Sequence, residues 1–192
     1  MNAAGKETAL ILQTPRLLLR PFRIEDAADV YAYARDSRVG PIAGWQPHQS
    51  EEESREIIRT VFSASAVFAV VRKDTGRVVG SAGFVGNHPT GSFSDCPDDE
   101  VGYALSPAEW GSGLIPEAVK AVLEYGFTEL GLKRIWCGHY AGNWRSRRVM
   151  EKCGFSYQFS KTEDVPLMGE TRQTYYYVLT EEMWRDGISG AF

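Results

Sequence analysis

Residues 104–118 read ALSPAEWGSGLIPEA and decide the fold, because a strand-like segment runs through a glycine-containing turn into an amphipathic helix. Gly111 and Gly113 allow the backbone to approach a ligand closely, so that free N–H groups can point at an anion. Pro116 is expected at the first helical position, where its missing N–H would have no partner. Glu117 suits the positive end of the helix dipole. The turn predicts either a diphosphate site or an ordinary strand-to-helix connection.

Two common phosphate-binding patterns do not fit this turn. A Walker loop requires GxxxxGK[ST], and no lysine follows either glycine at that spacing. A dinucleotide fingerprint requires GxGxxG, but Pro116 occupies the third glycine position. With both motifs excluded, the remaining candidate is a diphosphate ligand that neither motif binds. Coenzyme A is such a ligand.

A second segment, residues 133–155, reads KRIWCGHYAGNWRSRRVMEKCGF. Together the two segments resemble the GCN5-related N-acetyltransferase (GNAT) superfamily, and within it the ribosomal-protein N-terminal (RimJ/RimL-like) acetyltransferase branch. The acyl-CoA loop of the family, Gln/Arg-x-x-Gly-x-Gly/Ala, matches WGSGLI around Gly113. Trp110 and Ile115 depart from the general pattern but are familiar in the ribosomal-type branch. The downstream pattern of the family matches at Asn143, Ser146, Gly154 and Phe155.

The fold expected from hydrophobic periodicity is α+β (mixed α/β), with about seven mostly antiparallel strands and about four helices. The expected strands are 16–22, 66–72, 78–85, 100–105, 134–140, 157–162 and 174–179, and the expected helices are 24–33, 50–62, 115–130 and 143–153. The opening TPRLLLRPFRIEDA, residues 14–27, looks like the first strand of the branch and its entry into a helix. The resemblance covers residues 12–184 and implies a GNAT fold whose sheet splays between 100–105 and 134–140.

Composition limits the functional classes. The chain of 192 residues has 43% hydrophobic residues and a formal net charge of −4, which argues against direct nucleic-acid binding. No segment is apolar enough for a signal peptide or a membrane span. Three cysteines without CxxC pairing predict reduced thiols and a cytoplasmic location, and no His, Cys or carboxylate spacing suggests a metal. We expect a leader at 1–13, a single domain at 14–186 and a C-terminal tail at 187–192.

The cosubstrate that the resemblance implies is acetyl-CoA. Its pantetheine arm would lie along the strand backbone, and the turn amides and helix N-terminus would hold the pyrophosphate. The residues so implied for the strand are Tyr103, Ala104 and Leu105, and those for the turn are Trp110, Gly111, Ser112, Gly113 and Leu114. Asn143 would fix the pantetheine.

Ser146 follows Asn143 by three residues, in the first turn of the helix expected at 143–153. The resemblance implies that Ser146 protonates the departing thiolate of coenzyme A. Local capping is the alternative, because an Asn N-cap followed by a serine in the first turn requires no cofactor. Many relatives use a tyrosine as the acid near this helix, which keeps Tyr140 and Tyr157 as further candidates.

Glu100 begins the strand expected at 100–105, where members of the family often carry a carboxylate that takes a proton from the amine through water. The alternative is a solvated acid within the run Asp98, Asp99 and Glu100. An α-amino group has a pKa of about 7.7–8.0, whereas a lysine amine has one of about 10.4. A single carboxylate therefore suits an N-terminal or other weakly basic amine better than a lysine.

Four further residues have two interpretations each. Trp45 and His48 fall between the first two expected helices, where relatives form the wall of the acceptor site, or they belong to a plain packing loop. His139 faces either the cleft or the core. Cys137 lies near the thioester or is a small buried residue. The tyrosine run 175–177 is expected in the core or on the surface of a homodimer.

The leading function is an acetyl-CoA-dependent N-acetyltransferase that acts on a protein N-terminal α-amine, such as that of a ribosomal protein. One alternative is transfer to a small amine, such as a polyamine, an amino acid or an aminoglycoside. The other is a non-catalytic regulator that binds acyl-CoA without turnover. The acidic segment DCPDDE, residues 95–100, favours a cationic acceptor.

Overall fold

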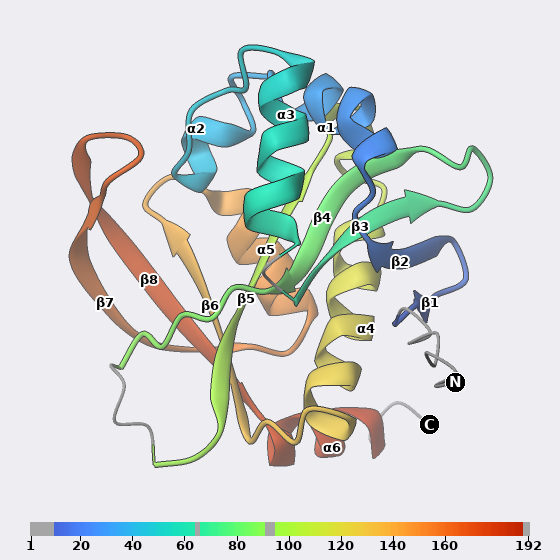
Figure 1. Cartoon of the computed structure of the whole chain (residues 1–192). Helices are drawn as coiled ribbons and strands as arrows, with labels where there is room; N and C mark the ends of the chain where they lie inside the picture. Colours follow the sequence, from blue (N-terminus) through green and yellow to red (C-terminus); the bar gives the residue numbers. More distant parts are fainter. Residues whose placement is uncertain (1–9, 64–65, 91–94, 190–192) are drawn as a thin grey trace, which may run out of the picture.

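A computed structural model describes residues 10–63, 66–90 and 95–189 of the chain. One sheet of eight strands forms its centre, in the order β1-β2-β3-β4-β5-β6-β8-β7 (Figure 1). The strands are β1 (Leu12–Gln13), β2 (Leu17–Pro21), β3 (Ala66–Arg72), β4 (Val78–Phe84), β5 (Asp98–Leu105), β6 (Arg134–Tyr140), β7 (Ser156–Val165) and β8 (Glu170–Thr180). All neighbouring strands pair antiparallel except β5 and β6, which are parallel. The mixed α/β architecture expected from the sequence is confirmed, with an additional short strand, β1.

The sheet opens between β5 and β6, as the resemblance implied. Only three residue pairs join the two strands, and the last of these is Glu100 with Trp136. Beyond Glu100, β5 still pairs with β4 as far as Leu105, but its other edge has no partner strand in the described part of the chain. The diverging strands leave a wedge whose walls are the second half of β5 and the second half of β6.

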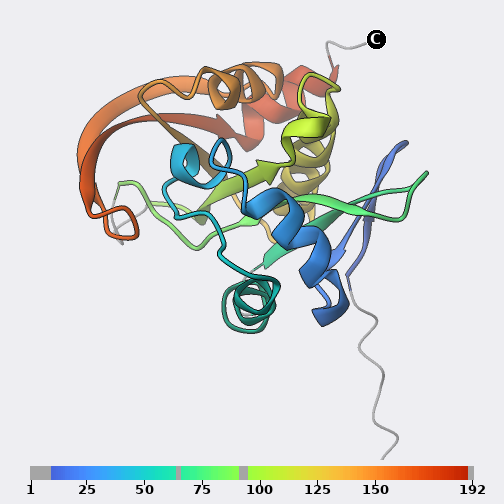
Figure 2. The same cartoon turned by 90° about the horizontal axis from the view of Figure 1, so that it is seen from above.

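Helices cover both faces of the sheet. They are α1 (Ala27–Ala34), α2 (Gly40–Ala43), α3 (Glu51–Ile57), α4 (Leu114–Thr128), α5 (Trp144–Lys152) and α6 (Glu181–Ser189). Figure 2 shows α1, α2 and α3 on one side of the sheet and α4, α5 and α6 on the other. Helix α3 continues into a wider π-helical turn at Ile58–Phe62. The short helix α2 and the C-terminal helix α6 add to the four helices expected from the sequence.

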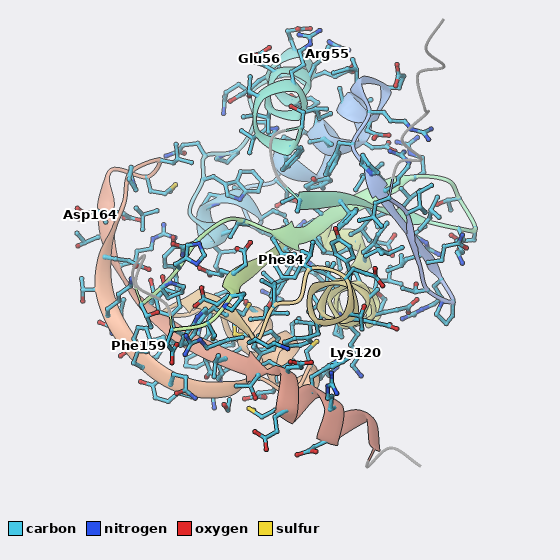
Figure 3. The ribbon with its side chains drawn as sticks, turned by 60° about the horizontal axis from the view of Figure 1, so that its bottom comes forward. Arg55, Glu56, Phe84, Lys120, Phe159 and Asp164 are labelled. Atoms are coloured by element: carbon cyan, nitrogen blue, oxygen red, sulfur yellow. The ribbon has the colours of Figure 1, made fainter. Side chains whose placement is uncertain are left out.

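The largest part of the core lies beneath α4. Its buried side includes Ala118, Val119, Val122 and Leu123, at the spacing of one helical face. Leu130, expected in the same stripe, is instead 44% exposed because α4 ends at Thr128. Figure 3 shows Phe84 of β4 in the interior and Lys120 at the surface.

The start of α4 differs from the expectation. The helix begins at Leu114, so Pro116 lies at its third position and not at its first. Gly113 is the N-cap residue, with a φ of +79° that favours glycine. Proline is still tolerated at the third position, because the first-turn N–H groups of a helix have no intrahelical acceptor.

The ends of the chain lie partly outside the described residues, which exclude 1–9 and 190–192. β1 falls within the expected leader 1–13 and pairs with β2. α6 extends from the end of β8 to Ser189, across the domain boundary expected at 186. No helix in residues 10–63, 66–90 and 95–189 is long and apolar enough to cross a membrane.

Candidate active site

A cleft of about 780 Å³ occupies the wedge between β5 and β6 and extends under α1, α2 and α3. Seven of the residues predicted to bind cofactor or substrate or to act in catalysis line this one cleft, although they come from three separate segments. They are Trp45, His48, Glu100, Tyr103, Ala104, Asn143 and Ser146. The remaining predicted cofactor residues, Leu105 and 110–114, do not line it. Leu105 is the last residue of β5, and residues 110–114 lead into the beginning of α4.

Ser146 lies in the first turn of α5, where Asn143 is the N-cap residue. The amide oxygen of Asn143 accepts the backbone N–H of Ser146 at 3.2 Å. The hydroxyl of Ser146 lies 2.9 Å from the hydroxyl of Tyr103. Asn143 therefore caps the helix, and the Ser146 side chain contacts Tyr103, another residue that lines the cleft.

Tyr103 is the tyrosine that contacts Ser146. Its hydroxyl also donates to the Ser146 carbonyl at 3.2 Å, and the thiol of Cys137 lies 3.8 Å away. Burial raises the pKa of Tyr103 well above its usual value and raises that of the Cys137 thiol as well. Both groups are therefore protonated at neutral pH. Cys137 is buried, at 2% exposure, and lines the cleft.

The two tyrosines named from the sequence as alternative acids lie elsewhere. Tyr157 is 52% exposed and packs against Tyr175 and Tyr177, away from the cleft lining. Tyr140 lines the cleft, but its ring lies under the Arg172 guanidinium, 5.0 Å from ring centroid to cation. Neither makes a hydrogen bond with Ser146 within the described part of the chain, whereas Tyr103 does.

Glu100 is held in the cleft rather than in solvent. Its carboxylate accepts the N–H of Gly138 at 3.1 Å and a hydrogen bond from the Asn87 side-chain amide. Burial, together with the nearby charge of Glu163, raises the pKa of Glu100 to about 7. A carboxylate with this pKa is partly ionised at neutral pH and can accept a proton there.

The acidic run around Glu100 separates in the structure. The carboxylate of Asp98 lies 2.7 Å from Nδ1 of His88 and accepts the Trp136 indole N–H at 3.0 Å. Asp99 accepts the backbone N–H of Gly86 at 2.9 Å. Asp98 and Asp99 thus have structural partners, and Glu100 is the member of the run that lines the cleft.

The glycine turn lies at the beginning of α4. Gly111 and Gly113 both have positive φ, +81° and +79°. The N–H groups of Gly111, Gly113 and Leu114 have no acceptor among the residues that the structure describes. Free N–H groups at the positive end of a helix form an anion site.

Side chains from other elements fix this turn. Glu117 accepts the backbone N–H of Arg16 at 2.9 Å and its Nε at 2.7 Å. Arg16 also donates to the carbonyl of Ser112 at 2.9 Å. Glu117 therefore ties α4 to the start of β2, and it leaves a guanidinium beside the turn.

Trp110 connects the turn to the helix that carries Ser146. Its indole N–H donates to the Leu105 carbonyl at 3.0 Å. The guanidinium of Arg145 lies 4.3 Å from the centroid of the Trp110 ring. Since Arg145 immediately precedes Ser146, the ring joins the end of β5, the glycine turn and the first turn of α5.

Trp45 and His48 lie on the opposite side of the cleft, between α2 and α3. Their rings lie 5.4 Å apart, and Nδ1 of His48 lies 2.8 Å from the Ser54 hydroxyl. Burial lowers the pKa of His48, so the imidazole is neutral at pH 7. The structure thus brings both residues to the wall where acceptor contacts were expected.

Other residues of the cleft carried no clear signal in the sequence. His139, which could face the cleft or the core, lines the cleft although it is only 5% exposed. Glu163 of β7 and Tyr176 of β8 also line it. Alternation along β7 and β8 assigns these two side chains to the cleft only when the register of β7 against β8 is known. The sequence does not give this register. Within the described residues no group of three or more His, Cys, Asp or Glu could hold a metal ion.

Comparison with known proteins agrees with this geometry. The acetyltransferase (GNAT) domain family matches residues 16–156 of the chain. An uncharacterized N-acetyltransferase of Bacillus subtilis (strain 168), YnaD, is 29% identical over 173 residues, which cover 90% of this chain and 98% of that protein. The ribosomal protein uS5 alanine N-acetyltransferase of Escherichia coli (strain K12) is 26% identical over 189 residues, 92% of this chain and 93% of that enzyme.

Solved structures give the same result for the fold. A crystal structure of a GNAT-family acetyltransferase from Bacillus anthracis has a TM-score of 0.77 and 28% sequence identity to this chain. The match covers 90% of this chain and 99% of that one. The splayed sheet, the glycine turn before α4 and the family match together identify the chain as an acyltransferase, a member of the GNAT family of N-acetyltransferases.

Proposed function

We propose that the chain transfers an acetyl group from acetyl-CoA to a protein N-terminal α-amine. The observation that carries this proposal is the position of Glu100 and of the Tyr103–Ser146 pair on the walls of one cleft. A group that takes a proton and a group that gives one are both required when an amine replaces a thiol.

The residues present fit acetyl-CoA. Free N–H groups at Gly111, Gly113 and Leu114, with Arg16 beside them, suit a diphosphate. The open edge of β5 at Tyr103 and Ala104 suits the amides of an extended pantetheine arm. When bound, acetyl-CoA supplies the acetyl group as an activated thioester, the donor that the GNAT family uses.

The side chains divide the proton transfers between them. Glu100 accepts a proton from the amine, directly or through water. Ser146 donates a hydrogen bond toward the departing sulfur, and Tyr103 orients that hydroxyl through the 2.9 Å contact. Trp45 and His48 form the wall against which the acceptor lies.

The pKa of Glu100 favours an α-amine over a lysine. At about 7 it lies close to the 7.7–8.0 of an α-amino group, but more than three pH units below the 10.4 of a lysine. A proton moves to Glu100 with little cost from the first amine and at a large cost from the second. The similarity to a ribosomal protein alanine N-acetyltransferase supports the same acceptor class. A cytoplasmic location and a homodimer stay predictions from the sequence.

The test is a panel of acceptors in one assay of thiol release from acetyl-CoA. Peptides with free N-termini are compared with the same peptides blocked at the N-terminus but carrying an internal lysine, and with small amines. We expect transfer to the free N-termini. Transfer to the lysine side chain alone, or to none of the amines, would contradict the proposal.

A further inference from the structure

The loop that follows β4 is fixed to the beginning of β5, beside the cleft. The backbone N–H of Gly86 donates to the carboxylate of Asp99 at 2.9 Å. Two residues later, Nδ1 of His88 lies 2.7 Å from the carboxylate of Asp98. These are the first two carboxylates of β5. Asn87 lies between the two contacts in the chain and is therefore held at a defined place beside the strand.

Asn87 contacts the third carboxylate of the run, Glu100. The side-chain amide of Asn87 donates to Oε2 of Glu100, and the backbone N–H of Gly138 donates to Oε1 at 3.1 Å. Each oxygen thus receives one donor. An ionised carboxylate only accepts hydrogen bonds, so both contacts favour the ionised form. Asn87 also lines the cleft, which Gly86 and His88 do not.

The two donors differ in how they are built. Gly138 donates from the backbone of β6, which pairing with β8 holds in place. Asn87 donates from a side chain on a loop and is itself exposed. Replacement of Asn87 therefore removes one donor from Glu100, leaves the other in place and disturbs no buried packing.

The remaining groups around Glu100 leave this role to the two donors. Burial raises the pKa of Glu100 to about 7, and the hydrogen bonds from Asn87 and Gly138 act in the opposite direction. On β7, Glu163 raises the pKa of Glu100 and Lys161 lowers it. These two side chains lie 3.0 Å apart, so their effects partly cancel. The other titratable side chains that interact with Glu100 have pKa values raised by burial and are neutral at pH 7: Cys137, Tyr140 and Tyr176.

We propose that Asn87 is a positioning residue of this site, whose amide keeps Glu100 ionised and oriented so that it can accept the proton of the amine at neutral pH. The proposal deepens the proposed function and rests on it. Asn87 does not touch the reacting atoms in this arrangement and acts only through Glu100. The β4–β5 loop, which the sequence presents only as a connection, then determines the pH range in which the base works.

The test follows the titration of Glu100 directly and compares it with turnover. Carbon-13 labelling of the glutamate carboxyl groups allows NMR to record the titration, and the signal missing from Glu100→Gln assigns it. The midpoint in the parent should lie at about pH 7. The pH dependence of kcat/KM, which reports the groups of the free enzyme, is measured by thiol release with one N-terminal peptide. The same peptide serves for every variant, so the ionisation of its own amine contributes equally.

Two replacements of Asn87 should move the midpoint to different extents. Asn87→Leu keeps the approximate size of the side chain and removes the donor. Its midpoint should rise by about one pH unit, as for the loss of one charge-assisted hydrogen bond. Asn87→Asp replaces the donor by a second carboxylate and should raise the midpoint further. The kcat/KM profiles should move with the titrations. The control is Thr90→Val, a change from a polar to an apolar side chain at an exposed position of the same loop, outside the cleft lining. It should keep the midpoint of the parent.

Each result decides a different point. An unchanged titration of Glu100 in Asn87→Leu would overturn the positioning role and leave acetyl transfer intact. A higher KM for the peptide with an unchanged titration would also overturn it, because Asn87 would then bind the acceptor. A shifted titration with an unshifted kcat/KM profile would instead contradict the role of Glu100 as the base in the proposed function.

Discussion

The hydroxyl groups of Tyr103 and Ser146 lie 2.9 Å apart, although the two residues are 43 positions apart in the chain. Tyr103 comes from β5 and Ser146 from α5, so the contact joins the opened edge of the sheet to the helix beside it. The tyrosine hydroxyl has one proton, and it is within reach of both the carbonyl and the hydroxyl of Ser146. When the tyrosine donates to the serine hydroxyl, the serine proton can point into the cleft.

Replacement of Ser146 tests its role as proton donor. Ser146→Ala should lower kcat by about 10²–10⁴-fold, the usual cost of removing a general acid, and leave the affinity for acetyl-CoA nearly unchanged. Tyr103→Phe should lower kcat less, because it only removes the group that orients the serine. The measurements are kcat by thiol release and acetyl-CoA binding by calorimetry.

A double replacement provides the control for this pair. If Tyr103 acts through Ser146, the double variant should be no slower than Ser146→Ala alone. If the fold-losses in kcat of the two single variants multiply in the double variant, Tyr103 contributes independently of Ser146. A Ser146→Ala protein with parental kcat and only a lower melting temperature would assign the serine to helix stability.

Replacement of Glu100 should change the pH dependence of the reaction. In the parent, kcat/KM for an N-terminal peptide should rise through about pH 7, as Glu100 loses its proton. Glu100→Gln should lower kcat/KM near neutral pH, and the loss should shrink above pH 8, where the α-amine deprotonates unaided. A loss that is the same at every pH would indicate that Glu100 only binds the acceptor.

The same replacement should change stability with a defined sign. Burial raises the pKa of Glu100 from the ordinary 4.5 to about 7, so the folded protein holds an extra proton between these values. Ionised Glu100 then destabilises the fold above about pH 7. Relative to the parent, Glu100→Gln should gain about 1–3 kcal/mol of unfolding free energy at pH 8 compared with pH 5. Urea titrations at both pH values measure this, and an equal effect at both would contradict it.

The elements of this fold follow from local patterns to a large extent. Alternation and apolar runs predicted β3 and β6 with the observed bounds, Ala66–Arg72 and Arg134–Tyr140. The start of α4 does not follow from Pro116, because the left-handed backbone of Gly113 ends the turn and the helix begins at Leu114. The helix α2 spans only Gly40–Ala43, too few residues for a periodic signal.

The sequence named several residues that line the cleft, but not their contacts, and the roles of these residues stay predictions. Motif spacing selected Asn143 and Ser146, and the start of an expected strand selected Glu100; all three line the cleft. The contact of Ser146 with Tyr103 depends on how far β5 and β6 diverge, a property of the whole sheet. The approach of Glu163 to Glu100 depends on the register of β7 against β8. Neither quantity is encoded in a window of neighbouring residues.

Two glycines, Gly126 of α4 and Gly187 of α6, provide a test of the packing. A Cβ on Gly126 would lie 2.5 Å from Cζ of Phe84 and 3.0 Å from Cδ1 of Ile135. Gly126→Ala should therefore destabilise the protein by about 1–3 kcal/mol. Gly187 in α6 meets no atom within 4 Å, so Gly187→Ala should be neutral or stabilise by up to about 1 kcal/mol. Denaturant titrations compare the two, and a stabilised Gly126→Ala protein would show that α4 and β4 are packed less closely.

The last prediction concerns the glycine turn. Gly113→Glu adds a side chain and a negative charge beside free N–H groups, where the diphosphate is expected. Acetyl-CoA binding should weaken by about 100-fold or more, which corresponds to at least 2.7 kcal/mol. The matched control is Gly76→Glu, because Gly76 also has positive φ, +69°, in the β3–β4 hairpin, with no neighbouring atom within 4 Å. Both variants carry the same backbone strain and the same charge, so strain alone would lower their melting temperatures together. Only Gly113→Glu should lose affinity for acetyl-CoA in calorimetry. Equal acetyl-CoA binding by the two folded variants would show that the diphosphate does not bind at this turn.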